Sequence, residues 1–136
     1  MKKQNNKILI VEDDLSLRPF WTSILNQCGF AHQLDWAVSC EQAQKLLRHA
    51  QSVSDPYAMI ITDIFLAGSD TGLDLLNSAE VLQSGAHKLL VSGADEKEIR
   101  ESFTNLSQEV MVLSKPLTVV KCKRVLEKAL PVRIGA

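Results

Sequence analysis

The sequence has no long apolar run, few aromatic residues and almost no net charge. None of its apolar runs approaches the roughly 20 residues that a membrane-spanning helix needs, so membrane insertion is not expected. Aromatic residues make up 5% of the chain. Fifteen Lys and Arg against 16 Asp and Glu leave a formal net charge of -1, which provides no general attraction to nucleic acid. We therefore expect neither a membrane protein nor direct binding of nucleic acid.

Cysteine is also scarce, with only Cys28, Cys40 and Cys122. Their number is odd, their spacing is not that of metal ligands, and each lies among apolar residues. Reduced, packed thiols in a cytoplasmic protein account for them, and no disulfide framework is predicted. The polar start, residues 1–6, is followed by a strand-length apolar stretch, which is not the pattern of a signal peptide.

Four short apolar runs predict buried strands, because each is rich in branched aliphatic residues and ends in polar ones. A fifth stretch, Ala31 to Ala37, has a patchy strand pattern in which His32 and Asp35 are polar, which suits a strand nearer the edge of the sheet. The expected strands cover 7–11, 31–37, 58–63, 87–91 and 110–114. Apolar residues at helical spacing lie between and after them. The expected helices cover 16–28, 39–50, 72–84, 95–106 and 118–130, with Ser16, Ser39, Asp95 and Thr118 as caps.

Some of these helices carry more specific expectations. The last helix is expected to turn Val119, Cys122, Val125, Leu126 and Leu130 inward. The helix over 95–106 has only a thin apolar stripe, which indicates a partly exposed helix. Trp21 and Trp36 are predicted to pack with partial exposure. The alternation of strand and helix predicts an α/β fold, a doubly wound domain with a five-stranded parallel sheet and five helices.

Polar side chains follow four of the predicted strands, at the carboxyl edge where ligands bind in such sheets. They are Glu12, Asp13 and Asp14 after the first strand, Asp63 after the third, Ser92 after the fourth and Lys115 after the fifth. Two carboxylates about 4 Å apart repel by roughly 4 kcal/mol at an effective dielectric of 20, so the cluster predicts a bound Mg²⁺. The hydroxyl and the ammonium would bind a phosphoryl group, with one carboxylate as nucleophile. The acidic first turn argues against a dinucleotide site, because it would repel a pyrophosphate.

Four motifs in order carry a resemblance to a known family. They are Ile8 to Asp14 with Arg18 beyond it, Ile60 to Asp63, Leu90 to Ala94, and Leu113 to Pro116. Over about residues 7–130, the chain resembles a response-regulator receiver domain of bacterial two-component signalling, of the chemotaxis-regulator-like superfamily. Residues 1–136 are accordingly expected to be one receiver domain. The resemblance implies a flavodoxin-like sheet with strand order 2-1-3-4-5 and a cis bond between Lys115 and Pro116.

The resemblance also implies roles for the residues at the carboxyl edge. Asp63 would accept a phosphoryl group from a histidine kinase or phosphotransfer protein, and the protein would not otherwise be an enzyme. Ser92 and Lys115 would contact the phosphoryl group. Asp14 is a variable third acid outside the site. The Mg²⁺ ligands would be Asp13, Asp63 and the backbone carbonyl of Phe65, with Glu12 helping through water.

Three positions depart from the family pattern. Ala67 stands where a proline is usual, and Gly72 comes one residue late, which affects the loop rather than the nucleophile. Val112 replaces the aromatic residue that moves on activation, so the relay to a downstream protein target must differ in detail.

Several alternatives stay open. One is a receiver-like adaptor that acts without phosphorylation, and another is the N-terminal receiver of a longer regulator. A dimer through the helices expected over 95–106 and 118–130 is also compatible with the sequence. An aspartate-dependent phosphatase is disfavoured, because it would want a second acid where this chain has Phe65.

Overall fold

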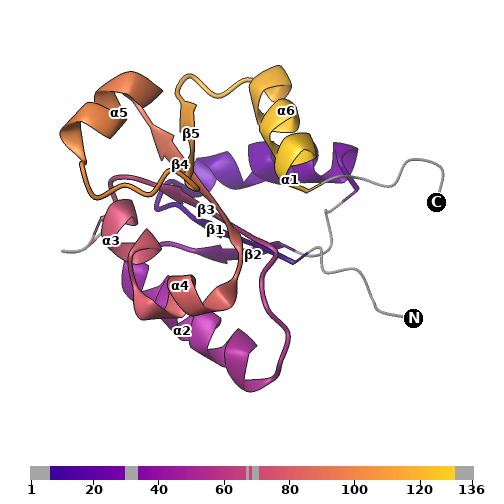
Figure 1. Ribbon diagram of the computed structural model, residues 1–136. Coiled ribbons are helices and arrows are strands. Elements are labelled where there is room, and N and C mark those ends of the chain that lie inside the picture. The colour runs from indigo at the N-terminus through magenta and orange to yellow at the C-terminus, as the bar shows by residue number, and fades with distance from the viewer. Residues whose placement is uncertain (1–6, 30–33, 67, 69–70, 131–136) are drawn as a thin grey trace.

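The protein folds around a five-stranded parallel sheet. The computed structural model describes residues 7–29, 34–66, 68 and 71–130. The strands are β1 (Ile8–Val11), β2 (Leu34–Ala37), β3 (Met59–Asp63), β4 (His87–Ser92) and β5 (Met111–Ser114). They are hydrogen-bonded in the order β2-β1-β3-β4-β5, and every neighbouring pair is parallel (Figure 1). The doubly wound fold and the strand order are therefore confirmed, while residues 31–33 of the expected second strand lie outside the described residues.

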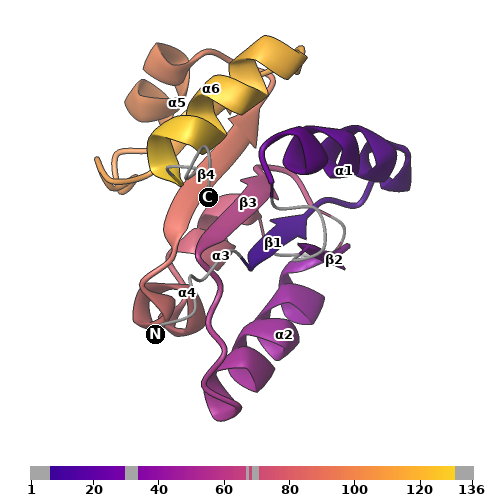
Figure 2. The ribbon, with the colours of Figure 1, turned by 90° about the vertical axis from the view of Figure 1, so that its right-hand side faces the viewer.

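Helices cover both faces of this sheet (Figures 1 and 2). They are a short 3₁₀ helix, η1 (Leu15–Leu17), and α1 (Arg18–Gln27), α2 (Cys40–Ser52), α3 (Gly72–Leu76), α4 (Ala79–Ser84), α5 (Glu96–Ser102) and α6 (Val119–Ala129). α1 and α6 share an apolar cluster with one face of the strands, and α2, α3 and α4 share another with the opposite face. Burial on both faces explains why the central strands β1 and β3 are continuous apolar runs instead of alternating ones, whereas the edge strand β2 contains Asp35 and is mostly half-buried. No helix within the described ranges is long and apolar enough to cross a membrane.

The start of the first helix differs from the prediction. Ser16 was expected to cap it, but Asp14 is the capping residue: its carboxylate accepts hydrogen bonds from Ser16 N at 3.0 Å and Ser16 Oγ at 2.6 Å. These bonds open η1, and α1 begins only at Arg18. Asp14 is the cap because an aspartate carboxylate readily accepts a hydrogen bond from the backbone N–H two residues ahead, which starts a turn before the helix.

The helix expected over 72–84 is divided in two. α3 ends at Leu76, and Ser78 then caps α4 by accepting a hydrogen bond from Val81 N at 3.4 Å. The helix expected over 95–106 ends at Ser102, although Leu106 is still buried. Helical spacing of apolar residues predicts which side chains are buried, but it does not exclude a break within the run.

Two packing predictions are wrong. Trp21 is only 2% exposed, because its ring belongs to the apolar cluster that α1 shares with the strands. Val119 was expected to face inward but is 42% exposed, since it is the first residue of α6 and the buried stripe begins at Cys122. All three cysteines are buried, as expected.

Candidate functional site

The acidic turn after β1 is held by β2. Glu12, 5% exposed, donates its N–H to the Ala37 carbonyl at 2.9 Å, and its own carbonyl accepts a hydrogen bond from Trp36 Nε1 at 3.0 Å. Asp13 is exposed beside it. Burial, the hydrogen bond to Asp13 and the charge of Asp63 raise the pKa of Glu12 to about 7. The turn therefore places a buried, readily protonated Glu12 next to an exposed Asp13.

An ion pair joins the ends of β3 and β5. Lys115 Nζ donates to Asp63 Oδ2 at 2.7 Å, and Phe65 N donates to Asp63 Oδ1 at 3.3 Å. Asp63 is 9% exposed, whereas the Lys115 side chain is 39% exposed. The hydrogen bond to Asp63 is the main cause that raises the pKa of Lys115. Both carboxylate oxygens of Asp63 thus accept hydrogen bonds at the carboxyl edge of the sheet.

Ser92 lies at the end of β4, between these two strands. It is 1% exposed, its Oγ accepts from Ala94 N at 3.0 Å, and its carbonyl accepts from Lys115 N at 2.7 Å. Ser114 Oγ in turn donates to the Ala94 carbonyl at 3.1 Å. The loop between β4 and α5 is therefore tied to β5 next to Lys115. The bond between Lys115 and Pro116 is cis, as the resemblance implies.

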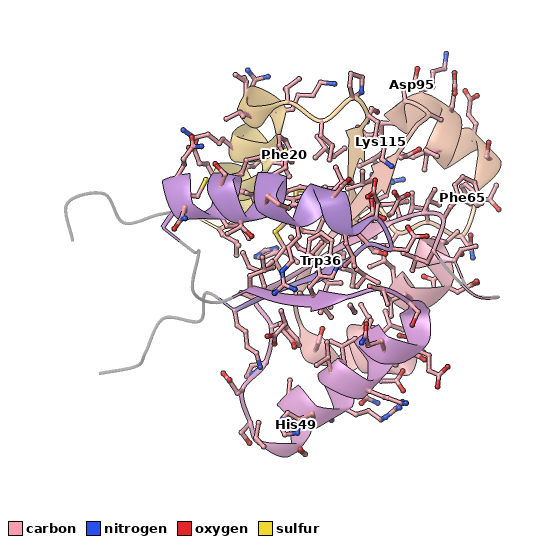
Figure 3. All side chains as sticks on the ribbon, turned by 180° about the vertical axis from the view of Figure 1, so that it is seen from behind. Phe20, Trp36, His49, Phe65, Asp95 and Lys115 are labelled. Atoms are coloured by element: carbon pink, nitrogen blue, oxygen red, sulfur yellow. The ribbon has the colours of Figure 1, made fainter. Side chains whose placement is uncertain are left out.

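Gly72 and Phe65 define the loop after Asp63. Gly72 N donates to the Ile64 carbonyl at 2.8 Å, and a Cβ at Gly72 would overlap the Asp63 carbonyl oxygen. The position that the sequence marks as one residue late therefore requires glycine. Phe65 is 74% exposed and lies at the outer side of the molecule, away from the core (Figure 3). Ala67, the other departure in this loop, lies outside the described residues.

Comparison with known proteins rests on the fold. No protein-family model and no curated protein sequence matches the chain. A response regulator receiver protein from Sinorhizobium medicae has 21% identity and a TM-score of 0.72, over 91% of this chain and 93% of that one. The chemotaxis protein CheY4 of Vibrio cholerae has 22% identity and a TM-score of 0.71, over 91% and 98%. The chain has the receiver-domain fold.

A third solved structure is relevant to metal binding. The receiver domain of a sensor histidine kinase from Pseudomonas aeruginosa has 17% identity and a TM-score of 0.68, over 92% of this chain and 97% of that one. It was solved with a magnesium ion coordinated in its active site cleft. These matches span nearly the whole length of each receiver domain compared.

The residues at the edge of this receiver fold suit a Mg²⁺ ion that keeps several waters. No three His, Cys, Asp or Glu side chains within the described part of the chain are grouped as a complete metal site. Mg²⁺ is usually held by one or two carboxylates together with waters and substrate oxygens, so it needs no such group. The donor set of Asp13, Asp63 and a backbone carbonyl matches this usual coordination of Mg²⁺. Burial is the main cause of the raised pKa of Glu12, and the charge of Asp63 adds to it, so a cation bound beside these acids would favour the ionised form of Glu12.

The structure thus brings Glu12, Asp63 and Lys115 into electrostatic contact and places Ser92 on the adjoining strand. Asp14, which the sequence left out of the site, is used as a cap. Sequence reasoning missed the hydrogen bond from Trp36 to Glu12. No sequence signal could have found it, because the two residues are 24 positions apart and the bond depends on the register of β1 and β2.

Proposed function

We propose that this chain is a phosphoacceptor receiver of a two-component phosphorelay, with Asp63 as the acceptor. The observation that carries the proposal is the contact of 2.7 Å between Lys115 Nζ and Asp63 Oδ2 at the carboxyl edge of the sheet. It puts an ammonium within reach of any oxygen attached to that carboxylate. Such a pairing of nucleophile and cation is what transfer of a phosphoryl group requires.

The reaction is a displacement at phosphorus. A carboxylate oxygen of Asp63 attacks the phosphorus of a phosphohistidine on a histidine kinase or phosphotransfer protein, and a P–O bond forms as the N–P bond breaks. The leaving imidazole recovers its ring nitrogen lone pair and takes up a proton. Lys115 and the Ser92 hydroxyl would bind the transferred oxygens. The chain itself would catalyse only this transfer and the later hydrolysis, so we do not class it as an enzyme.

Mg²⁺ would be held by Asp13, Asp63 and the Phe65 carbonyl, with Glu12 acting through water. When bound, it would neutralise the negative charge that gathers as a phosphoryl group approaches three carboxylates. The Pseudomonas receiver domain with magnesium in its cleft supports this choice of metal. For this chain, the support is the buried Glu12 beside Asp13 in the acidic turn and the raised pKa of Glu12.

The output would be a change in binding to a downstream protein target in the cytoplasm. If Ser92 Oγ turned toward the phosphoryl group, it would have to loosen its bond with Ala94 N, and the loop into α5 would follow. Val112 is partly buried against the core and has no ring to move, so this loop is the expected route. An adaptor that works without phosphorylation is the alternative.

Intact mass spectrometry tests the proposal. The chain is incubated with acetyl phosphate, a small phosphodonor, in the presence of either Mg²⁺ or EDTA. A gain of one phosphoryl group with Mg²⁺, and none with EDTA, is expected. A folded protein that gains no mass with Mg²⁺ would instead favour the adaptor.

A further inference from the structure

Two consecutive residues of β2 hold Glu12 at both of its backbone groups. The Glu12 N–H donates to the Ala37 carbonyl at 2.9 Å, and the Trp36 indole N–H donates to the Glu12 carbonyl at 3.0 Å. The first bond continues the ladder in which Val11 pairs with Ala37. The second comes from a side chain, and it fixes the backbone where β1 leaves the sheet and the acidic turn begins.

The fixed carbonyl belongs to the peptide unit that joins Glu12 to Asp13. Because a peptide unit is planar and rigid, the direction of its C=O also sets its N–H and the position of the next Cα. A hydrogen bond to the Glu12 carbonyl therefore restricts where the Asp13 carboxylate can point. It acts on Glu12 and Asp13 together, although Trp36 touches neither carboxylate in this bond.

The surroundings of Trp36 suit a lasting contact. The ring is partly buried and packs against the apolar cluster beneath α1, and Figure 3 places it between that helix and the sheet. The hydrogen bond is itself partly buried, so water competes for it less than at an exposed site. A phenylalanine could fill most of the same space but could not donate the bond.

We propose that Trp36 is a positioning residue of the magnesium site, and that its indole N–H holds the Glu12–Asp13 peptide in the orientation from which the Asp13 carboxylate reaches the cation directly and the Glu12 carboxylate reaches it through water. This inference rests on the proposed function and deepens it, because it assigns a residue of the edge strand to the metal site. It also makes the Trp36 N–H a reporter of metal binding, since a cation drawn to the acids must perturb the carbonyl between them.

The test compares Trp36→Phe with Trp21→Phe by calorimetric titration with Mg²⁺ and by thermal unfolding. Both changes remove an indole from the same apolar cluster, but only Trp36 donates to the Glu12 carbonyl. Loss of one hydrogen bond predicts Mg²⁺ affinity about fivefold weaker in Trp36→Phe. Trp21→Phe should keep the affinity of the parent while losing more thermal stability, because Trp21 is fully buried. A purely structural role for Trp36 predicts that affinity follows stability in both variants.

A second measurement needs no variant to fold. In the ¹H–¹⁵N spectrum of the parent, Mg²⁺ should shift the Trp36 indole resonance clearly more than that of Trp21. Equal Mg²⁺ affinity in the parent and in a folded Trp36→Phe would overturn the inference and leave the proposed function standing. A Trp36 indole resonance that does not shift in a parent that binds Mg²⁺ would have the same consequence. A parent that binds no Mg²⁺ would overturn both.

Discussion

Replacement of Gly72 by alanine should damage the fold at the point where it supports the site. The new Cβ would overlap the Asp63 carbonyl oxygen and lie 2.8 Å from the Asp63 carbonyl carbon and 2.9 Å from Thr62 Oγ1. Two of these three atoms are backbone, so the contact cannot be relieved by turning a side chain. Either β3 must shift, or the bond from Gly72 N to the Ile64 carbonyl must break.

Overpacking of a core typically costs about 1–3 kcal/mol, and a collision with backbone belongs at the upper end of that range. For a domain of this size, about 3 kcal/mol corresponds to a fall of roughly 10 °C in Tm. The assay is thermal and urea unfolding followed by circular dichroism. Gly93→Ala is the matched control, because nothing lies within 4 Å of a Cβ there and its φ is not positive.

The control should change the free energy of unfolding by no more than about 0.5 kcal/mol. Gly72→Ala should also slow phosphorylation of Asp63, since any relief of the collision moves the end of β3. Equal stability of the two alanine variants would refute the reasoning from close packing.

Three further predictions concern the site. Asp13→Ala should abolish Mg²⁺ binding in a calorimetric titration. Asp14→Ala should keep Mg²⁺ binding and lose only the small stabilising effect of its cap on η1, in which its carboxylate accepts from Ser16. Equal losses of affinity would mean that the ligands are misassigned. Without Mg²⁺, the urea midpoint should fall as pH rises from about 4.5 to about 7, because the pKa of Glu12 is raised in the folded state and the folded protein holds that proton more tightly than the unfolded chain. Glu12→Gln should remove this fall. A flat urea midpoint across this pH range in the parent would contradict the prediction. Phe65→Glu should lose its phosphoryl group faster than the parent, and Phe65→Leu should not, because a bulky apolar side chain hinders a water from approaching in line. Phe65 is 74% exposed, so both variants should remain stable, and an unchanged rate in Phe65→Glu would count against shielding.

The sheet was predictable because buried parallel strands are continuous apolar runs, and a chain that alternates them with helices has few possible topologies. The positions of Glu12, Asp63, Ser92 and Lys115 at the carboxyl edge were predictable for the same reason, since the carboxyl ends of parallel strands meet at one edge of the sheet. Helix boundaries were less predictable. The break at Ser78 and the cap by Asp14 are decided by single hydrogen bonds that compete with a continuous helix, and periodicity does not detect them.

Side-chain contacts between neighbouring strands could not be predicted from the sequence. The donation from Trp36 to Glu12 needs the exact pairing of β1 with β2, and a shift of one residue would turn the indole to the other face. The resemblance flagged Gly72 as late in its loop but gave no reason for glycine. The reason is the approach of its Cα to the Asp63 carbonyl, a distance that only the folded chain defines.

The identity of the phosphorylated residue tests the central claim most directly. The parent and Asp63→Asn are treated side by side with acetyl phosphate and Mg²⁺, and their intact masses are compared after both are shown to be folded. The account predicts a gain of one phosphoryl group in the parent and none in Asp63→Asn, because the amide cannot act as the nucleophile. A phosphoryl group on Asp63→Asn equal to that on the parent would contradict it.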